Sequence, residues 1–152
     1  IIDLQTIAKS VVDDFNNIYN SKRNISIKLL LNGKKNYKIF GIENRLEQII
    51  ANLLDNSISF SKNDQSIYVE LKEIDNNKIN LSVIDEGEGF KERDTEKIFK
   101  RFYSNRPTKF GEHSGLGLNI VKNLVELHSG TILASNNKGK NGAKVEIIFP
   151  KA

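Results

Sequence analysis

The feature that most constrains the fold of this chain is a glycine-rich run that passes directly into an apolar helix. Residues 111–118 read Gly-Glu-His-Ser-Gly-Leu-Gly-Leu, and the helical pattern continues to His128. Backbone N–H groups at a loop-to-helix junction have no partner within the helix, and the helix dipole adds partial positive charge there. Gly115 and Gly117 have no Cβ, so the backbone can approach an anion closely. The junction therefore suits a phosphate group, although glycines at a helix start more often serve only as caps.

Apolar periodicity predicts an alternation of helices and short strands along the chain. Apolar residues at helical spacing predict long helices over residues 3–20, 44–61 and 116–128, and a short helix over 94–102. Strands are predicted over residues 25–31, 37–40, 67–74, 78–84, 131–135 and 143–149, with Pro150 closing the domain. The first two strands are expected to pair across Asn32-Gly33, and the next two to form a hairpin. The fold class is therefore α/β (α+β): a two-layer sandwich of one mixed sheet with helices on one face, in a single domain over residues 1–152.

Composition narrows the classes of function. The chain has 152 residues, of which 38% are hydrophobic and 28% charged, and no apolar run approaches a membrane span. Cysteine is absent, which excludes disulfides and thiolate metal sites. The net charge is +4, but the lysines are dispersed and do not alternate with aromatics, so nucleic acid is not an expected partner. Methionine is absent and the chain begins at Ile1, so we expect a fragment of a longer protein.

Two asparagines share one face of the predicted helix over residues 44–61. Asn52 and Asn56 are four residues apart, and asparagine is a poor residue for a helix interior because its side chain competes for the backbone. A carboxamide oxygen can bind Mg²⁺, a hard cation that takes oxygen ligands. The alternative is a solvated polar face, since asparagine is usually exposed.

A second cluster follows the predicted strand over residues 78–84. The strand ends at Asp85, and the next residues, Glu86 to Phe90, include Gly87 and Gly89. A carboxylate at a strand end can accept a hydrogen bond from an exocyclic amine such as that of adenine, and the glycines let the chain turn tightly around a flat ring. The alternative is an ordinary turn built from turn-favouring residues. The spacing of a calcium loop is not met.

A third cluster combines aromatic and basic residues over 98–107, in the sequence Ile-Phe-Lys-Arg-Phe-Tyr-Ser-Asn-Arg-Pro. Ile98, Phe99 and Phe102 are expected to be buried, which leaves Arg101 and Arg106 free. Arginine suits bidentate contact with phosphate. The alternative is that these are ordinary surface arginines on a short helix.

These clusters occur in an order that resembles the ATP-binding catalytic domain of sensor histidine kinases. Residues 52–56 resemble the N box of that family, residues 85–89 the G1 box, residues 98–103 the F box and residues 111–118 the G2 box. The stretch from Gly115 to Gly130 is especially close to the family pattern. The resemblance covers nearly the whole chain, and four boxes in order are highly specific.

The resemblance implies a Bergerat ATP-binding fold, with ATP and Mg²⁺ as cofactors. It implies that Asn56 binds the metal, that Asn52 and Arg106 are catalytic, and that Asp85 recognises adenine. A lid from about Ser104 to Ser114 would close over the phosphates. The full set of expected cofactor contacts is Asn52, Asn56, Phe60, Lys62, Asp85, Gly87, Gly89, Arg101, Arg106, Ser114, Gly115, Leu116, Gly117 and Leu118.

The chain departs from the family pattern at three positions. Ser59 stands where the family commonly has a lysine that touches phosphate, Phe60 where it has tyrosine or histidine, and Ser104 where arginine often follows. Lys62 or Arg106 could supply the missing charge. Related ATPases carry a glutamate base four residues before the metal-binding asparagine, but Asn52 cannot take a proton. This difference favours phosphoryl transfer to a protein acceptor over hydrolysis.

The resemblance also implies partners for the chain. His113 and His128 lack the family's acceptor context, so the acceptor histidine is expected on a dimerisation domain upstream in the same kinase, and a response regulator is reached through the full-length protein. The chain is expected to be cytoplasmic, part of an inner-membrane sensor, without membrane contact of its own. Two alternatives stay open: a serine kinase of the anti-sigma type, and a pseudokinase, which Ser59 and Ser104 motivate.

Overall fold

The computed structural model describes residues 1–32, 36–75, 77–90, 95–100, 117–137 and 141–152. The helices are α1 (Leu4–Arg23), α2 (Glu43–Phe60), α3 (Gly117–Leu127) and a short 3-10 helix, η1 (Thr95–Phe99). The strands are β1 (Ile2–Asp3), β2 (Ser26–Asn32), β3 (Lys38–Ile39), β4 (Ser66–Ile74), β5 (Lys78–Ile84), β6 (Thr131–Asn136) and β7 (Ala143–Pro150).

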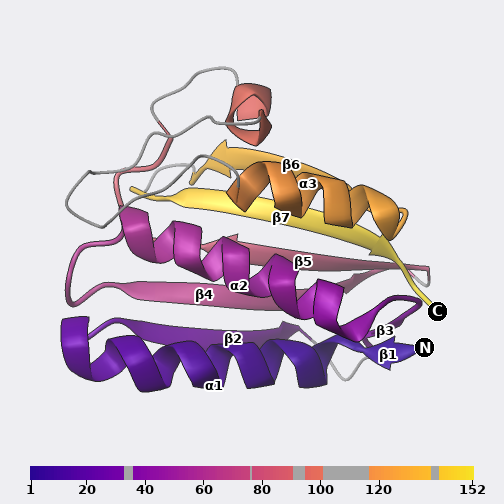
Figure 1. The fold of residues 1–152 in the computed structure, drawn as a ribbon, viewed down its shortest axis with the longest axis horizontal. Helices are drawn as coiled ribbons and strands as arrows, with labels where there is room; N and C mark the ends of the chain where they lie inside the picture. The colour runs from indigo at the N-terminus through magenta and orange to yellow at the C-terminus, as the bar shows by residue number, and fades with distance from the viewer. Residues whose placement is uncertain (33–35, 76, 91–94, 101–116, 138–140) are drawn as a thin grey trace.

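The main sheet has five strands in the order β2-β4-β5-β7-β6. Its β2–β4 pair is parallel and its other pairs are antiparallel, so the predicted mixed sheet and the predicted β4–β5 hairpin are confirmed. Figure 1 shows α1, α2 and α3 side by side over one face of this sheet, with α2 in the middle. The two-layer α/β architecture is therefore the one predicted.

The predicted pairing of residues 25–31 with 37–40 is wrong. Instead β2 pairs in parallel with β4, while β3 forms a separate two-stranded sheet with β1, where Ile39 lies opposite Ile2. Parallel strands need a long crossover connection, and α2 supplies it between β2 and β4. The segment before α2 then lies against the start of α1, where the Leu4 N–H donates to the Tyr37 carbonyl at 3.0 Å.

The other predicted elements agree with the structure to within a few residues. The predicted helix over 94–102 corresponds to η1, which is 3-10 and ends at Phe99, and the last of the predicted residues lie outside the described part of the chain. Pro150 belongs to β7, opposite Lys78, and so does close the last strand.

Strand alternation sets which face each side chain of the sheet occupies. On β5, Ile79, Leu81 and Val83 are buried in the core beneath the helices. Because successive side chains point to opposite faces, the next residue of this series, Asp85, also points toward the helices. A carboxylate thus continues a row of apolar core residues at the end of β5.

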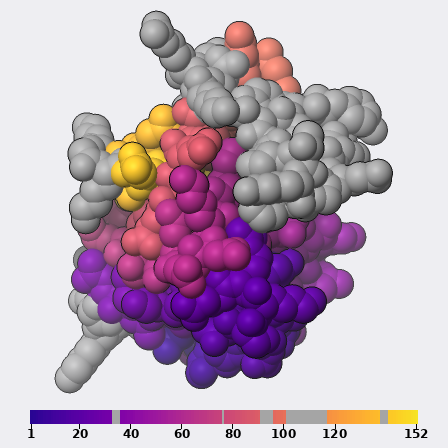
Figure 2. Space-filling view, turned by 90° about the vertical axis from the view of Figure 1, so that its left-hand side faces the viewer, coloured from indigo at the N-terminus to yellow at the C-terminus, as the bar shows by residue number. Residues whose placement is uncertain are grey.

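Different structural elements lie at the two ends of the helix layer. At the left of Figure 1 lie the last turn of α2, the first turn of α3, the end of β5 and the beginning of β7. Figure 2 looks onto this end of the molecule, where α1 and α2 finish. The small β1–β3 sheet and both chain termini lie at the opposite end. The described cluster that follows β5 and the last turn of α2 therefore lie together at the first end.

Candidate functional site

Asp85 is a buried carboxylate, and the structure gives its two oxygens different hydrogen-bonding environments. Only 2% of the residue is exposed. Its Oδ1 accepts hydrogen bonds from the N–H groups of Gly87 at 2.9 Å and Ala143 at 3.1 Å. Within the described part of the chain, Oδ2 has no hydrogen-bond partner. Buried polar atoms are normally paired, so this oxygen is suited to a donor from a ligand.

Burial raises the pKa of Asp85 above its ordinary value. The hydrogen bonds from Ala143 and Gly87 act in the opposite direction because they stabilise the charged form, and the negative charge of Glu86 raises the pKa further. Because the pKa is raised overall, the two hydrogen bonds offset only part of the cost of removing the charged carboxylate from water. A donor at Oδ2 would supply the missing compensation.

The turn after Asp85 requires glycine at two positions. A Cβ on Gly87 would lie 2.3 Å from the Phe60 carbonyl oxygen, so the turn runs directly against the last residue of α2. Gly89 has a φ of +84°, in the left-handed region that side chains disfavour. The turn is therefore shaped by contact with α2 as well as by its own conformation.

A stripe along α2 presents Asn52, Asn56 and Phe60 at intervals of four residues. Asn56 is only 3% exposed, so the alternative of a solvated polar face does not hold for it, while Asn52 is half-buried. The ring of Phe60 packs edge-on against Phe90, with 5.9 Å between ring centroids and 74° between planes. This contact joins the end of the stripe to the turn that begins at Asp85.

The last turn of α2 is capped by hydroxyl groups and by one arginine. The Ser59 Oγ donates to the Asn56 carbonyl at 2.6 Å, and the Ser61 Oγ to that of Ser57 at 2.8 Å. Arg23, from the end of α1, donates to the carbonyls of Ile58 at 3.1 Å and Ser61 at 2.6 Å. Ser59 is therefore held within the helix, while Lys62 is exposed in the turn that follows.

The structure describes only some of the residues predicted for the phosphate end of the site. Arg101, Arg106, Ser114, Gly115 and Leu116, and the predicted lid from Ser104 to Ser114, lie outside the described residues. Gly117 is the first residue of α3, as the predicted loop-to-helix junction requires. Leu118 is buried in the hydrophobic core.

Sequence reasoning missed the residues that hold the site together from a distance. The Asn136 carboxamide is hydrogen-bonded to Phe90, the Ala143 N–H to Asp85, and Arg23 to the end of α2. Asn136 and Ala143 flank a segment rich in asparagine and glycine, which is the composition of a turn and gives no sign of its contacts. A pattern along the chain does not report contacts across 46 or 58 positions.

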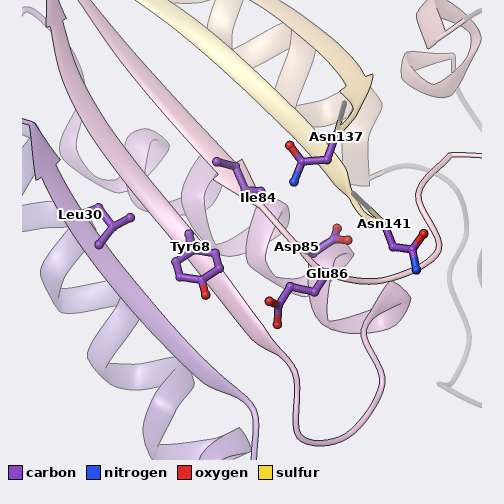
Figure 3. A pocket seen from close by; sticks show the side chains of 7 residues that line it. All are labelled: Leu30, Tyr68, Ile84, Asp85, Glu86, Asn137 and Asn141. Atoms are coloured by element: carbon purple, nitrogen blue, oxygen red, sulfur yellow. The ribbon is translucent and has the colours of Figure 1, made fainter. Parts of the chain in front are cut away.

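A cavity of about 640 Å³ lies at the same end of the sheet but on its helix-free face (Figure 3). Leu30, Tyr68 and Ile84 line it, together with Asp85, Glu86, Asn137 and Asn141. Neither Asn52 nor Asn56 is among its lining residues. This cavity therefore borders Asp85 and Glu86 but not the two asparagines of α2.

The site is compatible with magnesium but holds no acidic metal centre. In the described ranges, no group of three or more histidine, cysteine, aspartate or glutamate side chains is placed to bind a metal. Asn56 offers a carboxamide oxygen, a ligand type that Mg²⁺ accepts. A metal at this position would therefore depend on ligand oxygens for most of its coordination.

Comparison with known proteins identifies the family. The model for histidine kinase-, DNA gyrase B- and HSP90-like ATPases matches residues 41–152. The chain belongs to this family. The family description names ATPases, so the chain belongs to a family of ATP-binding domains. In the described part of the chain, no helix has the length and apolar character needed to cross a membrane.

The relatives of this ATPase domain include sensor proteins. Sensor protein ChvG of Rhizobium meliloti (strain 1021) is 33% identical over 147 residues, which cover 93% of this chain and 26% of that protein. The chain thus spans about a quarter of the relative's length.

Solved structures share the fold. The mycobacterial sensor histidine kinase MprB has a TM-score of 0.83 at 23% identity, covering 98% of this chain and 95% of that one. Full-length ShkA in complex with AMPPNP has a TM-score of 0.80 at 24% identity, covering 99% of this chain and 31% of that one.

Proposed function

We propose that this ATPase-family domain is the ATP-binding catalytic domain of a two-component sensor histidine kinase. It binds Mg-ATP and donates the γ-phosphoryl group to a histidine on a separate phosphoacceptor domain. The observation that carries the proposal is the buried carboxylate of Asp85, whose Oδ2 has no partner in the described part of the chain. An adenine amine is a donor of the right kind for it. The name of the relative, a sensor protein, supports the same proposal.

The proposal assigns groups of the chain to each part of the nucleotide. Adenine donates its amine to Asp85 Oδ2, with its ring beside Gly87, Gly89 and Phe60. Asn56 and Asn52 lie one and two turns of α2 before Phe60, respectively, which directs them toward the phosphates. Phosphate contacts are also proposed for Lys62, for Arg101 and Arg106, and for the junction Ser114, Gly115, Leu116, Gly117 and Leu118.

Magnesium fits this donor set. Asn56 would hold it through the carboxamide oxygen, with phosphate oxygens and water completing the coordination. When bound, the ion would neutralise charge on the phosphates. The protein's own contribution is then to position the nucleotide, which is the larger part of catalysis in phosphoryl transfer.

The chemistry proposed is transfer to another residue, because α2 carries no carboxylate at the position from which a base activates water in related ATPases. Asn52 occupies the position where related ATPases place glutamate. In the transfer, the bond between the γ-phosphorus and the bridging oxygen breaks, a bond to the acceptor imidazole nitrogen forms, and ADP leaves.

His128 is not available as the acceptor. It is 8% exposed, and its Nε2 accepts from the Ile42 N–H at 3.1 Å. Its Nδ1, which therefore carries the proton, donates to the Leu124 carbonyl at 2.8 Å. Both ring nitrogens are thus engaged in joining the end of α3 to the start of α2. The acceptor is proposed to lie on a dimerisation domain of the same kinase, in a cytoplasmic part of an inner-membrane sensor that serves a response regulator.

Phosphoryl transfer tests the proposal directly. The parent kinase, incubated with Mg²⁺ and γ-labelled ATP, should acquire a label that is lost in acid and stable in base, as phosphohistidine is. The Asn56→Ala variant should lose nearly all labelling, whereas Asn17→Ala, at an exposed position of α1, should label normally. Equal labelling of the Asn56→Ala variant would contradict the metal role, and an acid-stable label would contradict the histidine acceptor.

A further inference from the structure

The turn over residues 85–90 depends on outside partners for its hydrogen bonds. It lies between β5 and the undescribed residues 91–94 and forms no helix or strand of its own. Gln65 Nε2 donates to the Glu86 carbonyl at 3.0 Å, and the Ser66 N–H donates to Glu86 Oε1 at 2.6 Å. One hydrogen bond lies within the turn, from the Gly87 N–H to Asp85 Oδ1, and the other outside partners come from the ends of β6 and β7. The conformation of the turn is thus set by neighbours that are distant in sequence.

Asn136 holds both backbone polar groups of Phe90. Its Oδ1 accepts from the Phe90 N–H at 2.7 Å, and its Nδ2 donates to the Phe90 carbonyl at 3.0 Å. This side chain therefore acts as a peptide group from one further strand. Aspartate has the acceptor without the donor, and leucine has the shape without either group.

Gly89 makes room for this contact. A Cβ at residue 89 would lie 2.7 Å from Asn136 Oδ1, and the positive φ of Gly89 already disfavours any other residue. The two positions fit each other: the carboxamide occupies the space that the glycine leaves. We call the Asn136 carboxamide and the Phe90 backbone the amide clamp.

The same region also fixes Asp85. A Cβ on Gly142, whose φ is +125°, would lie 2.0 Å from the Asp85 carbonyl oxygen. The Asp85 N–H donates to the Ala143 carbonyl at 3.0 Å, and Asp85 Oδ1 accepts from the Ala143 N–H. Asp85 is thus held at the start of the turn by β7, and Phe90 at its end by β6.

We propose that Asn136 is a positioning residue for adenine recognition: the amide clamp holds the turn so that Asp85 Oδ2 faces the base and Phe90 supports Phe60. This inference rests on the proposed function, because it assigns a geometric cause to the role of Asp85. Without the clamp, the turn keeps its attachment at Asp85 but loses it at Phe90. The carboxylate is then no longer oriented, and the contribution of the adenine amine to binding falls.

Nucleotide discrimination tests the positioning role. ADP carries the amine, whereas inosine diphosphate carries a carbonyl oxygen there and a proton on the neighbouring ring nitrogen N1, with the same ribose and phosphates. The Asn136→Leu variant should bind ADP about tenfold more weakly, as expected for two lost hydrogen bonds, and inosine diphosphate nearly as the native chain does. Asn136→Asp should fall between, and its matched control is Asn137→Asp, because within the described part of the chain the side chain of that neighbouring residue makes no hydrogen bond to the turn. Equal losses for both nucleotides in Asn136→Leu, or no loss for either, would overturn the proposal.

Amide hydrogen exchange tests the amide clamp without nucleotide. In Asn136→Leu, the Phe90 and Gly87 N–H groups should exchange at least about tenfold faster, while those of β5 should keep their native rates. Unchanged exchange at Phe90 and Gly87 would overturn the clamp. If the native chain bound both nucleotides equally, the proposed role of Asp85 would fail, and exchange would still decide whether Asn136 holds the turn.

Discussion

In its proposed role, Asp85 exchanges stability for the recognition of adenine. A carboxylate in the core row of β5 is costly to bury, and the two backbone N–H groups on Oδ1 offset only part of that cost. An apolar or amide side chain would suit this position better in the free protein. The charge has a use only when a donor arrives at Oδ2.

Asp85→Asn should weaken ADP binding and leave the fold intact or more stable. Asparagine can still accept from Gly87 and Ala143 through its oxygen, but it presents an N–H group to the adenine amine. We expect a loss of about 1–3 kcal/mol, or roughly 5- to 150-fold in affinity. Calorimetric titration with ADP measures this, and thermal unfolding checks the fold. Equal ADP affinity of the native and variant proteins would contradict the adenine role.

The stability of the domain should carry a pH dependence that Asp85→Asn removes. Because the pKa of Asp85 is higher in the folded protein than its ordinary value of 3.8, the folded state holds this proton more tightly. The contribution of Asp85 to the free energy of unfolding is therefore full below that ordinary value and falls as pH rises through the folded-state pKa.

Urea unfolding from about pH 4 to about pH 7 measures this contribution as the difference between the native and Asp85→Asn proteins. As pH rises, the free energy of unfolding of the native protein should fall relative to that of Asp85→Asn, and the difference should then become constant. The variant Asp14→Asn, at an exposed position of α1, controls for the loss of one negative charge. A difference that is independent of pH would contradict the raised pKa.

Single functional candidates could be identified from sequence where a polar residue interrupted or ended an apolar helix or strand. Asp85 ended an apolar strand and Asn56 interrupted an apolar helix, and both are buried at the same end of the molecule. Asn136 sat among other polar residues before a turn, where asparagine is ordinary. Its role depends on Phe90, so no local conflict marked it.

At the scale of elements, the end of α2 depends on a residue of α1. Arg23 donates to two carbonyls of the last turn, Ile58 and Ser61, and to Asn63 Oδ1 at 2.8 Å. The positive charge also lies at the negative end of the helix dipole. This one side chain therefore joins α1, α2 and the turn that carries Lys62.

Arg23→Ala should destabilise the domain by about 2 kcal/mol, since charge-assisted hydrogen bonds to half-buried carbonyls are lost. Arg23→Lys should recover only part of this, because an ammonium group cannot reproduce the planar fork. The exposed neighbour Lys22, replaced by alanine, is the control. Urea unfolding midpoints measure all three variants. If Arg23→Ala lowered the unfolding midpoint no more than Lys22→Ala does, the cap would contribute little to stability.

Elements were predictable where local pattern and tertiary burial coincide. The helices and the β4–β5 hairpin follow from periodicity because each buries one face of its own. The pairing of β2 was not predictable, because Asn32-Gly33 suggests a hairpin while the actual partner, β4, lies beyond α2. The two-residue strands β1 and β3 are too short to give a pattern.

For the whole molecule, the separation of nucleotide site and acceptor has a kinetic consequence. The isolated domain should bind ATP yet release phosphate at close to the background rate, because water attack without a base lacks a contribution of about 10²–10⁴-fold. A phosphate-release assay with Mg²⁺ and ATP measures this, and Asn52→Glu, which restores the carboxylate, should raise the rate. Hydrolysis at about one turnover per second or faster by the native domain would favour an ATPase over a kinase.

The attachment of the site to the end of the chain bears on biosynthesis. Asp85 and Phe90 are translated well before Asn136 and Ala143, yet both depend on them for hydrogen bonds. A nascent chain that has emerged only as far as α3 contains Asp85 and the asparagines of α2. Its turn over residues 85–90, however, is not yet held in place by β6 and β7. Nucleotide binding is therefore expected to begin only when β6 and β7 have joined the sheet. Binding of an ATP analogue by a ribosome-attached nascent chain would thus report that β6 and β7 are in place.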